Sequence, residues 1–375
     1  MKIGIITLQL DTNYGGILQA YALQTVLRNL GHDPIILNRK WRVYSHRLLN
    51  FIVYWRHRLD SRKEWIPSNR DYDIVEMHTR KFIKCYIKRS KRLYSTKALR
   101  RYVRWHKVDA CIVGSDQVWR YLYSGPVIGN YYLDFTHDLP IKRMAYAASF
   151  GIDEWDYPNK DEQLCASLAK KFDAVSVRER SGVETCREHL GVDAIHLIDP
   201  TLLLPRTTYE NLVVKANVPL SEGDMFCYIL DHNLEIDTLT KSISQTLGLK
   251  AFYVEPNAVM EKNNNNSPRA KDCIVPPVEC WLRAFMDAKL VITDSFHGCV
   301  FSIIFNKPFW VVGNIKRGMA RFNSLLELFG LQNRMISINN TKSIDFMQSI
   351  DWENVNVRKV EMVSEALRFL INNLQ

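Results

Sequence analysis

The sequence has no long hydrophobic run, and this excludes a protein that spans the membrane with a helix. Its longest apolar stretches, such as LLNFIVYW at 48–55, fall far short of the roughly 20 residues that a spanning helix needs. The N-terminal MKIGIITLQLD has one lysine, a short apolar run and an early Asp11, which is unlike a signal peptide and typical of a first β-strand. We therefore expect a cytoplasmic protein.

Cysteine pairs with CxxC spacing are also missing, although the chain contains eight cysteines. Their absence argues against a zinc ribbon and against a redox pair. Several cysteines lie in apolar runs, as Cys111 does in DACIVG at 109–114, so we expect buried, reduced thiols. No cluster of metal ligands is visible in the sequence, and we expect neither a metal nor a cofactor.

Acidic residues are scarce in one segment. Between Arg39 and Lys107 there are 21 Lys or Arg against five Asp or Glu, a net charge of +16, whereas the whole chain carries +10. The window also holds twelve aromatic residues. Such sequence is typical of a surface that lies on an anionic membrane. The stretch 42–58 fits this best, because its apolar centre is flanked by Arg42, Arg47, Arg56 and Arg58.

Two other interpretations of this segment remain open. The same composition could bind nucleic acid, but no zinc finger or RNP-type motif supports that, and we expect no nucleic acid partner. The segment could also be a solvated helical insertion whose apolar stripe belongs to the core.

Short β-branched runs alternate with helical patterns along the rest of the chain. In the first half, strands are predicted at 3–7, 34–38, 109–114, 144–149, 173–179 and 194–198, and helices at 17–31, about 160–171 and 180–190. In the second half, strands are predicted at 225–230, 249–255, 290–294 and 308–313, and helices at 234–248, 276–289, 295–306, 319–330 and 357–374.

This alternation predicts an α/β protein with two Rossmann-like, doubly wound domains facing across a cleft. The proline-flanked LIDPTLLLP at 197–205 marks the boundary. We assign residues 1–205 to the first domain, with the basic insertion at about 40–107, and residues 206–356 to the second. Residues 357–375 form a C-terminal helix that we expect to pack back on the first domain. Ligands of such sheets bind beyond the strand ends.

The first strand-end motif is Asn13-Tyr14-Gly15-Gly16, between the first strand and the first helix. Paired glycines let backbone N–H groups approach a ligand, and a helix N-terminus favours an anion or a polar oxygen. A structural tight turn is the alternative.

The second motif begins at Gly114, after DACIV, and contains Ser115, Asp116, Gln117 and Trp119. Carboxylate and amide groups suit sugar hydroxyls, and the tryptophan could stack on a sugar ring. The alternative is that Ser115 or Asp116 merely caps the next turn.

The third motif is TDSFHG at 293–298, which runs from a strand into a helix. His297 is well placed for proton transfer, and Asp294 could orient it or act as a base itself. The alternative is that Asp294 or Ser295 caps the helix and His297 is an ordinary polar residue.

From Ser295 to Leu326 there is no acidic residue in 32 positions, although Lys307, Lys316, Arg317 and Arg321 occur there. Such a stretch beside a helix N-terminus suits a small, highly charged anion, because arginine can grip phosphate or carboxylate with two hydrogen bonds. Nucleotide-sugar glycosyltransferases of this architecture usually place an acidic residue here to hold the ribose, and its absence argues against them.

Six ordered motifs resemble those of the polysaccharide pyruvyl transferase family, over nearly the whole chain. They are NYGGILQAYAL (13–23), GSDQVW (114–119), SVRERSG (176–182), DPTLLL (199–204), TDSFHGCVFSIIFNKPF (293–309) and RGMARFNSLLELFGL (317–331). The resemblance implies a fold similar to the GT-B glycosyltransferases. It also implies transfer of pyruvate from phosphoenolpyruvate, the co-substrate, to two hydroxyls of a sugar, giving a cyclic ketal and phosphate.

The resemblance assigns roles to three residues, His297, Arg317 and Arg321, and the strand-end motifs supply the other candidates named here. His297 matches the proposed acid or base, with Asp294 and Asp116 as further catalytic candidates. Donor binding falls to Arg317, Arg321, Lys316, Ser295 and Gly298, in the second domain. Acceptor binding falls to the first domain, to Asn13, Tyr14, Gly15, Gly16, Ser115, Gln117 and Trp119.

One position departs from the family pattern. Some branches carry Arg-Leu-His where this chain has Ser295-Phe296-His297, so an arginine two positions before the histidine is missing. A glycosyltransferase with another anionic donor and a non-catalytic sugar-binding relative remain the alternatives. A polyprenyl-diphosphate-linked oligosaccharide is a plausible acceptor, which would bring the basic segment to the inner face of the cytoplasmic membrane.

Overall fold

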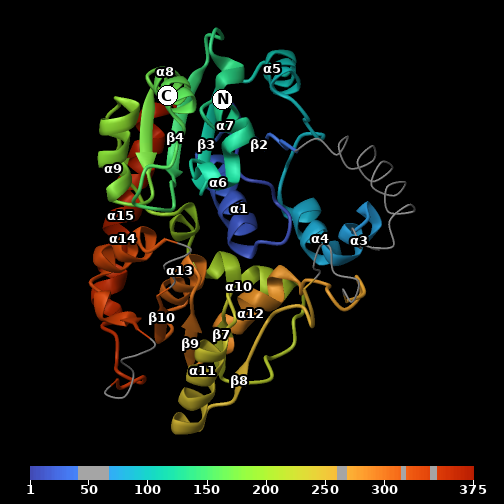
Figure 1. The fold of residues 1–375 in the computed structure, drawn as a ribbon, viewed down its shortest axis with the longest axis vertical. Helices are drawn as coiled ribbons and strands as arrows, with labels where there is room; N and C mark the ends of the chain where they lie inside the picture. The colour runs from blue at the N-terminus through green and yellow to red at the C-terminus, as the bar shows by residue number, and fades with distance from the viewer. Residues whose placement is uncertain (41–66, 260–267, 314–317, 338–343) are drawn as a thin grey trace.

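The computed structural model describes residues 1–40, 67–259, 268–313, 318–337 and 344–375, and it contains two parallel sheets, one in each half of the molecule (Figure 1). The first sheet has the strand order β2-β1-β3-β4-β5-β6. Its strands are β1 (Lys2–Ile6), β2 (Asp33–Ile36), β3 (Ala110–Asp116), β4 (Lys142–Ala148), β5 (Ala174–Val177) and β6 (Ile195–His196). The central strand β3 is buried over its whole length, as expected for a parallel sheet covered on both faces.

The helices of this half lie around the sheet, as the blue and green ribbons of Figure 1 show. They are α1 (Tyr14–Asn29), α3 (Asn69–Val75), α4 (Met77–Tyr86), α5 (Thr96–Trp105), α6 (Tyr121–Ser124), α7 (Ile128–Tyr131), α8 (Asn159–Ala169) and α9 (Ser181–Thr185). The described part of the basic segment is therefore largely helical. Helix α5 lies beside the first sheet, whereas α4 contacts α1 of the first half and α12 of the second.

The second sheet has five parallel strands in the order β11-β10-β9-β7-β8. Its strands are β7 (Met225–Tyr228), β8 (Ala251–Phe252), β9 (Leu290–Thr293), β10 (Phe309–Val312) and β11 (Met335–Ile336). Its helices are α10 (Arg206–Lys215), α11 (Leu234–Leu247), α12 (Val278–Asp287), α13 (Phe296–Ile304) and α14 (Ala320–Phe329), and the chain then ends in helix α15 (Trp352–Asn373). Two α/β sheets of this kind confirm the predicted fold class.

Both sheets reverse their strand order at one point. In the first sheet β1 lies between β2 and β3, and in the second β7 lies between β8 and β9. At such a switch point the chain leaves neighbouring strands toward opposite faces, which opens a crevice beyond the strand ends. The loops after β1 and β3, and those after β7 and β9, are therefore where a ligand site belongs.

Helix α13 fills the space between the two halves (Figure 1), and all nine of its residues are buried. Ser295 is its N-cap, and the Ser295 side chain accepts a hydrogen bond from the N–H of Gly298 at 3.4 Å. A Cβ atom on Gly298 would lie 2.2 Å from Thr293 Oγ1, so only glycine lets α13 begin this close to β9. The helix also contacts the 3-10 turn Pro200–Leu203 of the first half.

Helix α15 connects the end of the chain with the first sheet. Lys142 Nζ on β4 donates to the backbone oxygen of Asn373 at 3.1 Å, and the rings of Tyr146 and Phe369 lie 6.4 Å apart. Helix α15 also contacts α14. We keep the domain boundaries near residues 205 and 356 as a proposal. Within the described residues, no helix has the length and apolar character needed to cross a membrane.

Two predicted elements differ from the structure, and some observed elements were not predicted. Helix α1 begins at Tyr14 rather than at residue 17, because Asn13 caps it by accepting from the N–H of Gly16 at 3.0 Å. Strand β8 is an edge strand of only two residues, and 253–255 leave the sheet instead of extending it. Helix α10 was not predicted from the sequence.

Candidate active site between the two halves

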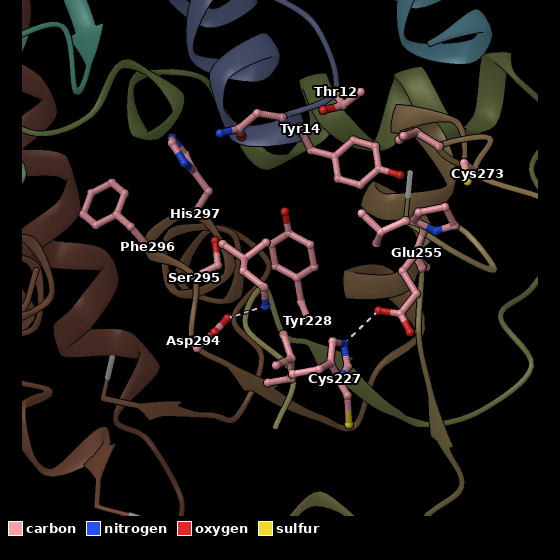
Figure 2. A pocket seen from close by; sticks show the side chains of 18 of the residues that line it. Thr12, Tyr14, Cys227, Tyr228, Glu255, Cys273, Asp294, Ser295, Phe296 and His297 are labelled. Atoms are coloured by element: carbon pink, nitrogen blue, oxygen red, sulfur yellow. Dashed lines mark hydrogen bonds and ion pairs between the residues drawn. The ribbon is translucent and has the colours of Figure 1, made fainter. Parts of the chain in front are cut away.

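A cavity of about 670 Å³ lies where the carboxyl ends of the two sheets face each other. The first half contributes the loops after β1 and β3, and the second half the loops after β7, β8 and β9. Figure 2 shows the side chains of His297, Phe296 and Ser295 on one side of this cavity, and those of Glu255 and Cys273 on the other, with Tyr14 and Tyr228 between them. The cavity is in the size range of enzyme sites that enclose a small substrate.

His297 lies at the junction of the two halves. Its Nε2 is 3.5 Å from Oδ2 of Asp199, a residue of the first half, although His297 itself belongs to α13. On its other side the ring packs on α1, since a Cβ added to Gly15 would lie 2.1 Å from His297 Nδ1. The imidazole is therefore held between a carboxylate and a glycine, both from the opposite domain.

Asp199 is a buried carboxylate with several partners. Its Oδ1 accepts hydrogen bonds from the N–H and Oγ1 of Thr201, and its Oδ2 accepts one from Arg178 Nη1 at 2.8 Å. Burial raises the pKa of Asp199, but the contacts with His297, Arg178 and the Thr201 N–H outweigh it and hold the pKa below its usual range. Asp199 is therefore ionised at neutral pH and can orient the imidazole of His297.

Two buried arginines share one aromatic ring beside the histidine. The guanidinium carbons of Arg178 and Arg321 lie 4.4 Å and 5.6 Å from the centroid of the Phe296 ring. Arg321 lines the cavity, and burial, followed by the charge of Arg178, lowers its pKa to about 10, so it remains a cation at neutral pH. Nε of Arg178 donates no hydrogen bond within the described part of the chain. Two cations this close favour an anionic ligand.

Asp116 also belongs to this group of charges. It lines the cavity at the end of β3, and its Oδ1 lies 3.7 Å from Arg178 Nη2. The same Oδ1 accepts a hydrogen bond from the N–H of Gln117 at 2.8 Å. The neighbouring Gln117 side chain lines the cavity as well, and its amide nitrogen has no hydrogen-bond partner among the described residues. This nitrogen is buried and packs against Gly151.

The position of Asp294 differs from the expectation that it orients His297. Asp294 is fully buried, and its two carboxylate oxygens accept hydrogen bonds from the N–H groups of Leu230 and Asp231 at 2.7 and 3.0 Å. In the view of Figure 2, Asp294 lies on the opposite side of Ser295 from the His297 ring. Asp294 therefore anchors the loop after β7, and the carboxylate beside His297 is that of Asp199.

Trp119 and Ser115 are placed differently from the acceptor-binding prediction. Trp119 is fully buried, stacks on Tyr132 at a centroid distance of 4.9 Å, and donates its indole N–H to Tyr131 O. The indole has no face open to a sugar because it completes the core of the first half. Ser115 is also fully buried, and its hydroxyl contacts Ala147 O and Asp199 Oδ2.

Five further predicted positions lie at the site. Asn13 and Tyr14 line the cavity, whereas Gly15 and Gly16 form the first turn of α1. Ser295 lines the cavity as well as capping α13. Arg42, Arg47, Arg56, Arg58, Lys316 and Arg317 lie outside the described residues, and their predicted roles stay predictions.

Sequence reasoning assigned no role to Asp199 or Arg178, although both lie in motifs that carry the family resemblance. A usable signal was present, because Arg178 directly follows strand β5 and Asp199 follows β6 by three residues. Applying the strand-end rule to every strand would have placed both beside the cavity. Their pairing with His297 depends on the packing of the two halves and has no signal in one sequence.

Three solved structures are similar to this chain, and the two that match at a TM-score of 0.50 support the two-domain architecture. Methanocaldococcus jannaschii UDP-GlcNAc 2-epimerase, in complex with UDP-GlcNAc and UDP, matches at a TM-score of 0.50 and 11% identity, over 100% of this chain and 99% of that one. S. aureus MnaA, in a co-structure with UDP, matches at 0.50 and 11%, over 99% and 97%. Acinetobacter baumannii MurG matches at 0.43 and 12%, over 99% and 98%.

With two parallel sheets facing across one cavity, the protein has the two-domain α/β architecture of the GT-B type. A family model for polysaccharide pyruvyl transferase matches residues 13–316, which is most of the chain. The chain belongs to the polysaccharide pyruvyl transferase family and is a transferase that acts on polysaccharides. No curated protein matches it.

The contact between Gly15 and His297 allows a sharp prediction. Gly15→Ala should lower turnover by roughly 100-fold, because the new methyl group must displace the imidazole and a shift of about 1 Å can cost that much. Gly16→Ala is the matched control, since its Cβ would meet Asp116 Oδ2 at 3.3 Å, and it should lose much less. Steady-state rates of the two folded variants decide this. Equal rates would mean that the ring can move without cost.

Proposed function

We propose that the protein transfers pyruvate from phosphoenolpyruvate to two hydroxyls of one sugar in a polysaccharide or its precursor, forming a cyclic ketal. The observation that carries this proposal is the pair of buried cations, Arg178 and Arg321, whose guanidinium carbons lie 4.4 and 5.6 Å from the ring centroid of Phe296, the residue before His297. Phosphoenolpyruvate carries a phosphate and a carboxylate within a few bonds of each other, so two adjacent guanidinium groups suit it. Arg321 contacts the donor from the cavity wall, and Arg178 adds positive charge behind it.

The proposed reaction uses one acid and two nucleophiles. Protonated His297 gives its proton to the methylene carbon of the donor, which becomes a methyl group, and positive charge develops on the adjacent carbon. The first sugar hydroxyl attacks that carbon, phosphate leaves with its bridging oxygen, and the second hydroxyl closes the ketal. Of the two hydroxyl protons, one restores His297, directly or through Asp116, and the other leaves with the phosphate.

Asp199 has a positioning role in this scheme. Its carboxylate lies 3.5 Å from Nε2 of His297 and orients the imidazole from the opposite domain. The acid is therefore complete only when the two halves are together, as they are in this structure. No step requires a redox cofactor, because the carbon skeleton of the donor changes by protonation and substitution alone.

Donor binding tests the proposal without an acceptor. Isothermal titration of the protein should give saturable binding of phosphoenolpyruvate and much weaker binding of UDP-GlcNAc. The reverse order would favour a glycosyltransferase with a nucleotide-sugar donor. Binding of neither donor, together with binding of a sugar, would favour a non-catalytic relative.

We also propose that the protein binds an anionic membrane surface, and helix α5 supports this within the described residues. Lys97, Arg100, Arg101 and Arg104 line one shallow depression together with Trp105, whose side chain is 82% exposed. The opposite face of the helix is buried through Leu99 and Val103. An exposed tryptophan among cations is the composition that lies at lipid headgroups.

Co-sedimentation with vesicles tests the membrane proposal. The protein should bind phosphatidylglycerol vesicles better than phosphatidylcholine vesicles, and high salt should reduce the difference. Arg101→Gln with Arg104→Gln should weaken binding by about 1 kcal/mol per charge, whereas Arg187→Gln on the exposed end of the first half should not. No preference for anionic vesicles at low salt would leave α5 as a solvated helix.

A further inference from the structure

The cavity extends well beyond the anion-binding end. Its far part is lined by Tyr228 and Ile229 at the end of β7, by residues 254–259 after β8, and by Val75 and Val275. Phosphoenolpyruvate is a three-carbon acid, so a donor beside His297 and Arg321 leaves most of the 670 Å³ open. The walls there come mainly from the second half of the chain, which sequence reasoning had assigned to the donor alone.

One polar group stands out in this far part, a histidine held between two carboxylates. His232 Nε2 is 3.0 Å from Glu255 Oε2, and His232 Nδ1 is 3.0 Å from Asp237 Oδ1. His232 and Glu255 both line the cavity, and Figure 2 shows the hydrogen bond between Glu255 and a ring nitrogen. Burial lowers the pKa of His232, but the bonds to Asp237 and Glu255 outweigh it and raise the pKa.

The surrounding elements of the second domain hold His232 and its two partner carboxylates in place. Asp294 binds the backbone of Leu230 and Asp231, and so fixes the loop that carries His232. Asp237 lies in the first turn of α11, whose N-cap is Asn233. Glu255 follows the short strand β8 by three residues and lines the cavity. The geometry is thus built by three elements of the second sheet.

We propose that the far part of the cavity binds the acceptor sugar, as a neutral hexopyranose whose hydroxyls are held by Glu255 and His232 and whose apolar face lies against Tyr228. This inference rests on the proposed function, because it assumes that the donor occupies the His297 end. It places the acceptor on the second domain, next to the donor, rather than on the first domain as the motifs suggested.

The chemistry of the walls favours a neutral sugar over an anionic group. A carboxylate accepts hydrogen bonds from sugar hydroxyls, and an aromatic ring packs on the C–H face of a pyranose, so the two together suit a carbohydrate. The carboxylates of Glu255 and Asp237 would repel a phosphate or a uronic acid. If the acceptor sugar is attached to a diphosphate carrier, we expect the carrier to extend out of the cavity in a direction away from the strand ends of the second domain.

Ligand-observed saturation-transfer NMR tests this directly. The probes are methyl glycosides of glucose, galactose, mannose and N-acetylglucosamine, added to the protein with and without phosphoenolpyruvate. At least one should show saturation transfer, and Glu255→Gln should raise its dissociation constant about tenfold or more, the scale of a hydrogen bond to a charged group. His232→Asn should act in the same direction. Glu235→Gln, an exposed carboxylate on α11 outside the cavity lining, is the matched control.

The outcomes separate this inference from the proposed function. Titration of phosphoenolpyruvate should give the same affinity in Glu255→Gln as in the wild-type protein, which also shows that the variant is folded. If the donor binds but no probe sugar does, or if Glu255→Gln and Glu235→Gln bind the sugar equally well, the acceptor site is elsewhere. If sugars bind as expected but phosphoenolpyruvate does not, the sugar site stands and the donor assignment is wrong.

Discussion

Replacing His297 with Gln is expected to lower kcat by roughly 10²–10⁴-fold, the contribution of a positioned general acid or base. The reason is the location of the imidazole between Asp199 and Gly15, at the edge of the cavity and beside the two arginines. Glutamine is similar in size and keeps a hydrogen-bonding group near Asp199, but it cannot deliver a proton at neutral pH. The measurement is phosphate release at saturating phosphoenolpyruvate.

A second histidine variant gives the baseline. His137→Gln changes an exposed side chain of the first half, outside the cavity lining, and should keep the wild-type rate. Circular dichroism and thermal unfolding should be alike for both variants. A folded His297→Gln protein with near-wild-type turnover would remove His297 from the proton transfer and would leave Asp116 as the candidate.

Replacing Arg321 with Gln is expected to weaken phosphoenolpyruvate binding by about 1.5–3 kcal/mol, the scale of a hydrogen bond to a charged group. Arg321 lines the cavity as a cation. Neither the nearby charge of Arg178 nor the face of the Phe296 ring can replace the hydrogen bonds that Arg321 would donate to phosphoenolpyruvate. Isothermal titration measures this directly. The affinity for the acceptor sugar should change little.

The control for this variant is an arginine of equal charge on the surface. Arg187→Gln removes an exposed cation paired with Glu184, and donor affinity should not change. An Arg321→Gln protein that binds the donor normally but loses sugar affinity would reverse the assignment of the two ends of the cavity. Because net charge changes equally in both variants, a general electrostatic effect would appear in both.

The sequence predicted the architecture well, because parallel α/β folds have strong local signals. Apolar runs such as 109–114 and 290–294 were identified as strands, and they form β3 and β9. The strand-end rule then pointed to Asp116 and His297, which both line the cavity. This part of the site follows from chain order alone, since every parallel strand ends at the same edge of its sheet.

The remaining part of the site depends on packing, which one sequence does not encode in a local pattern. Trp119 looked available for stacking, but the loop after β3 does not keep a regular alternation of side chains, and Trp119 is buried in the core whereas Gln117 lines the cavity. The contact of Asp199 with His297 joins residues of different domains. Strand β8 is shorter than predicted, and Glu255 lines the cavity instead of continuing the strand. The sequence pattern, an apolar run that ends in a glutamate, did not indicate this position for Glu255.

The measurement that tests the central claim most directly follows the carbon atoms of the donor. Phosphoenolpyruvate labelled with ¹³C at the carbon that bears the phosphate is incubated with the protein and with a saccharide fraction from cells that produce this protein. We predict that the label appears in the saccharide as a ketal carbon bonded to two sugar oxygens, with one phosphate released for each pyruvate transferred. Label that stays in phosphoenolpyruvate, or that appears only as free pyruvate, would contradict pyruvyl transfer by this site.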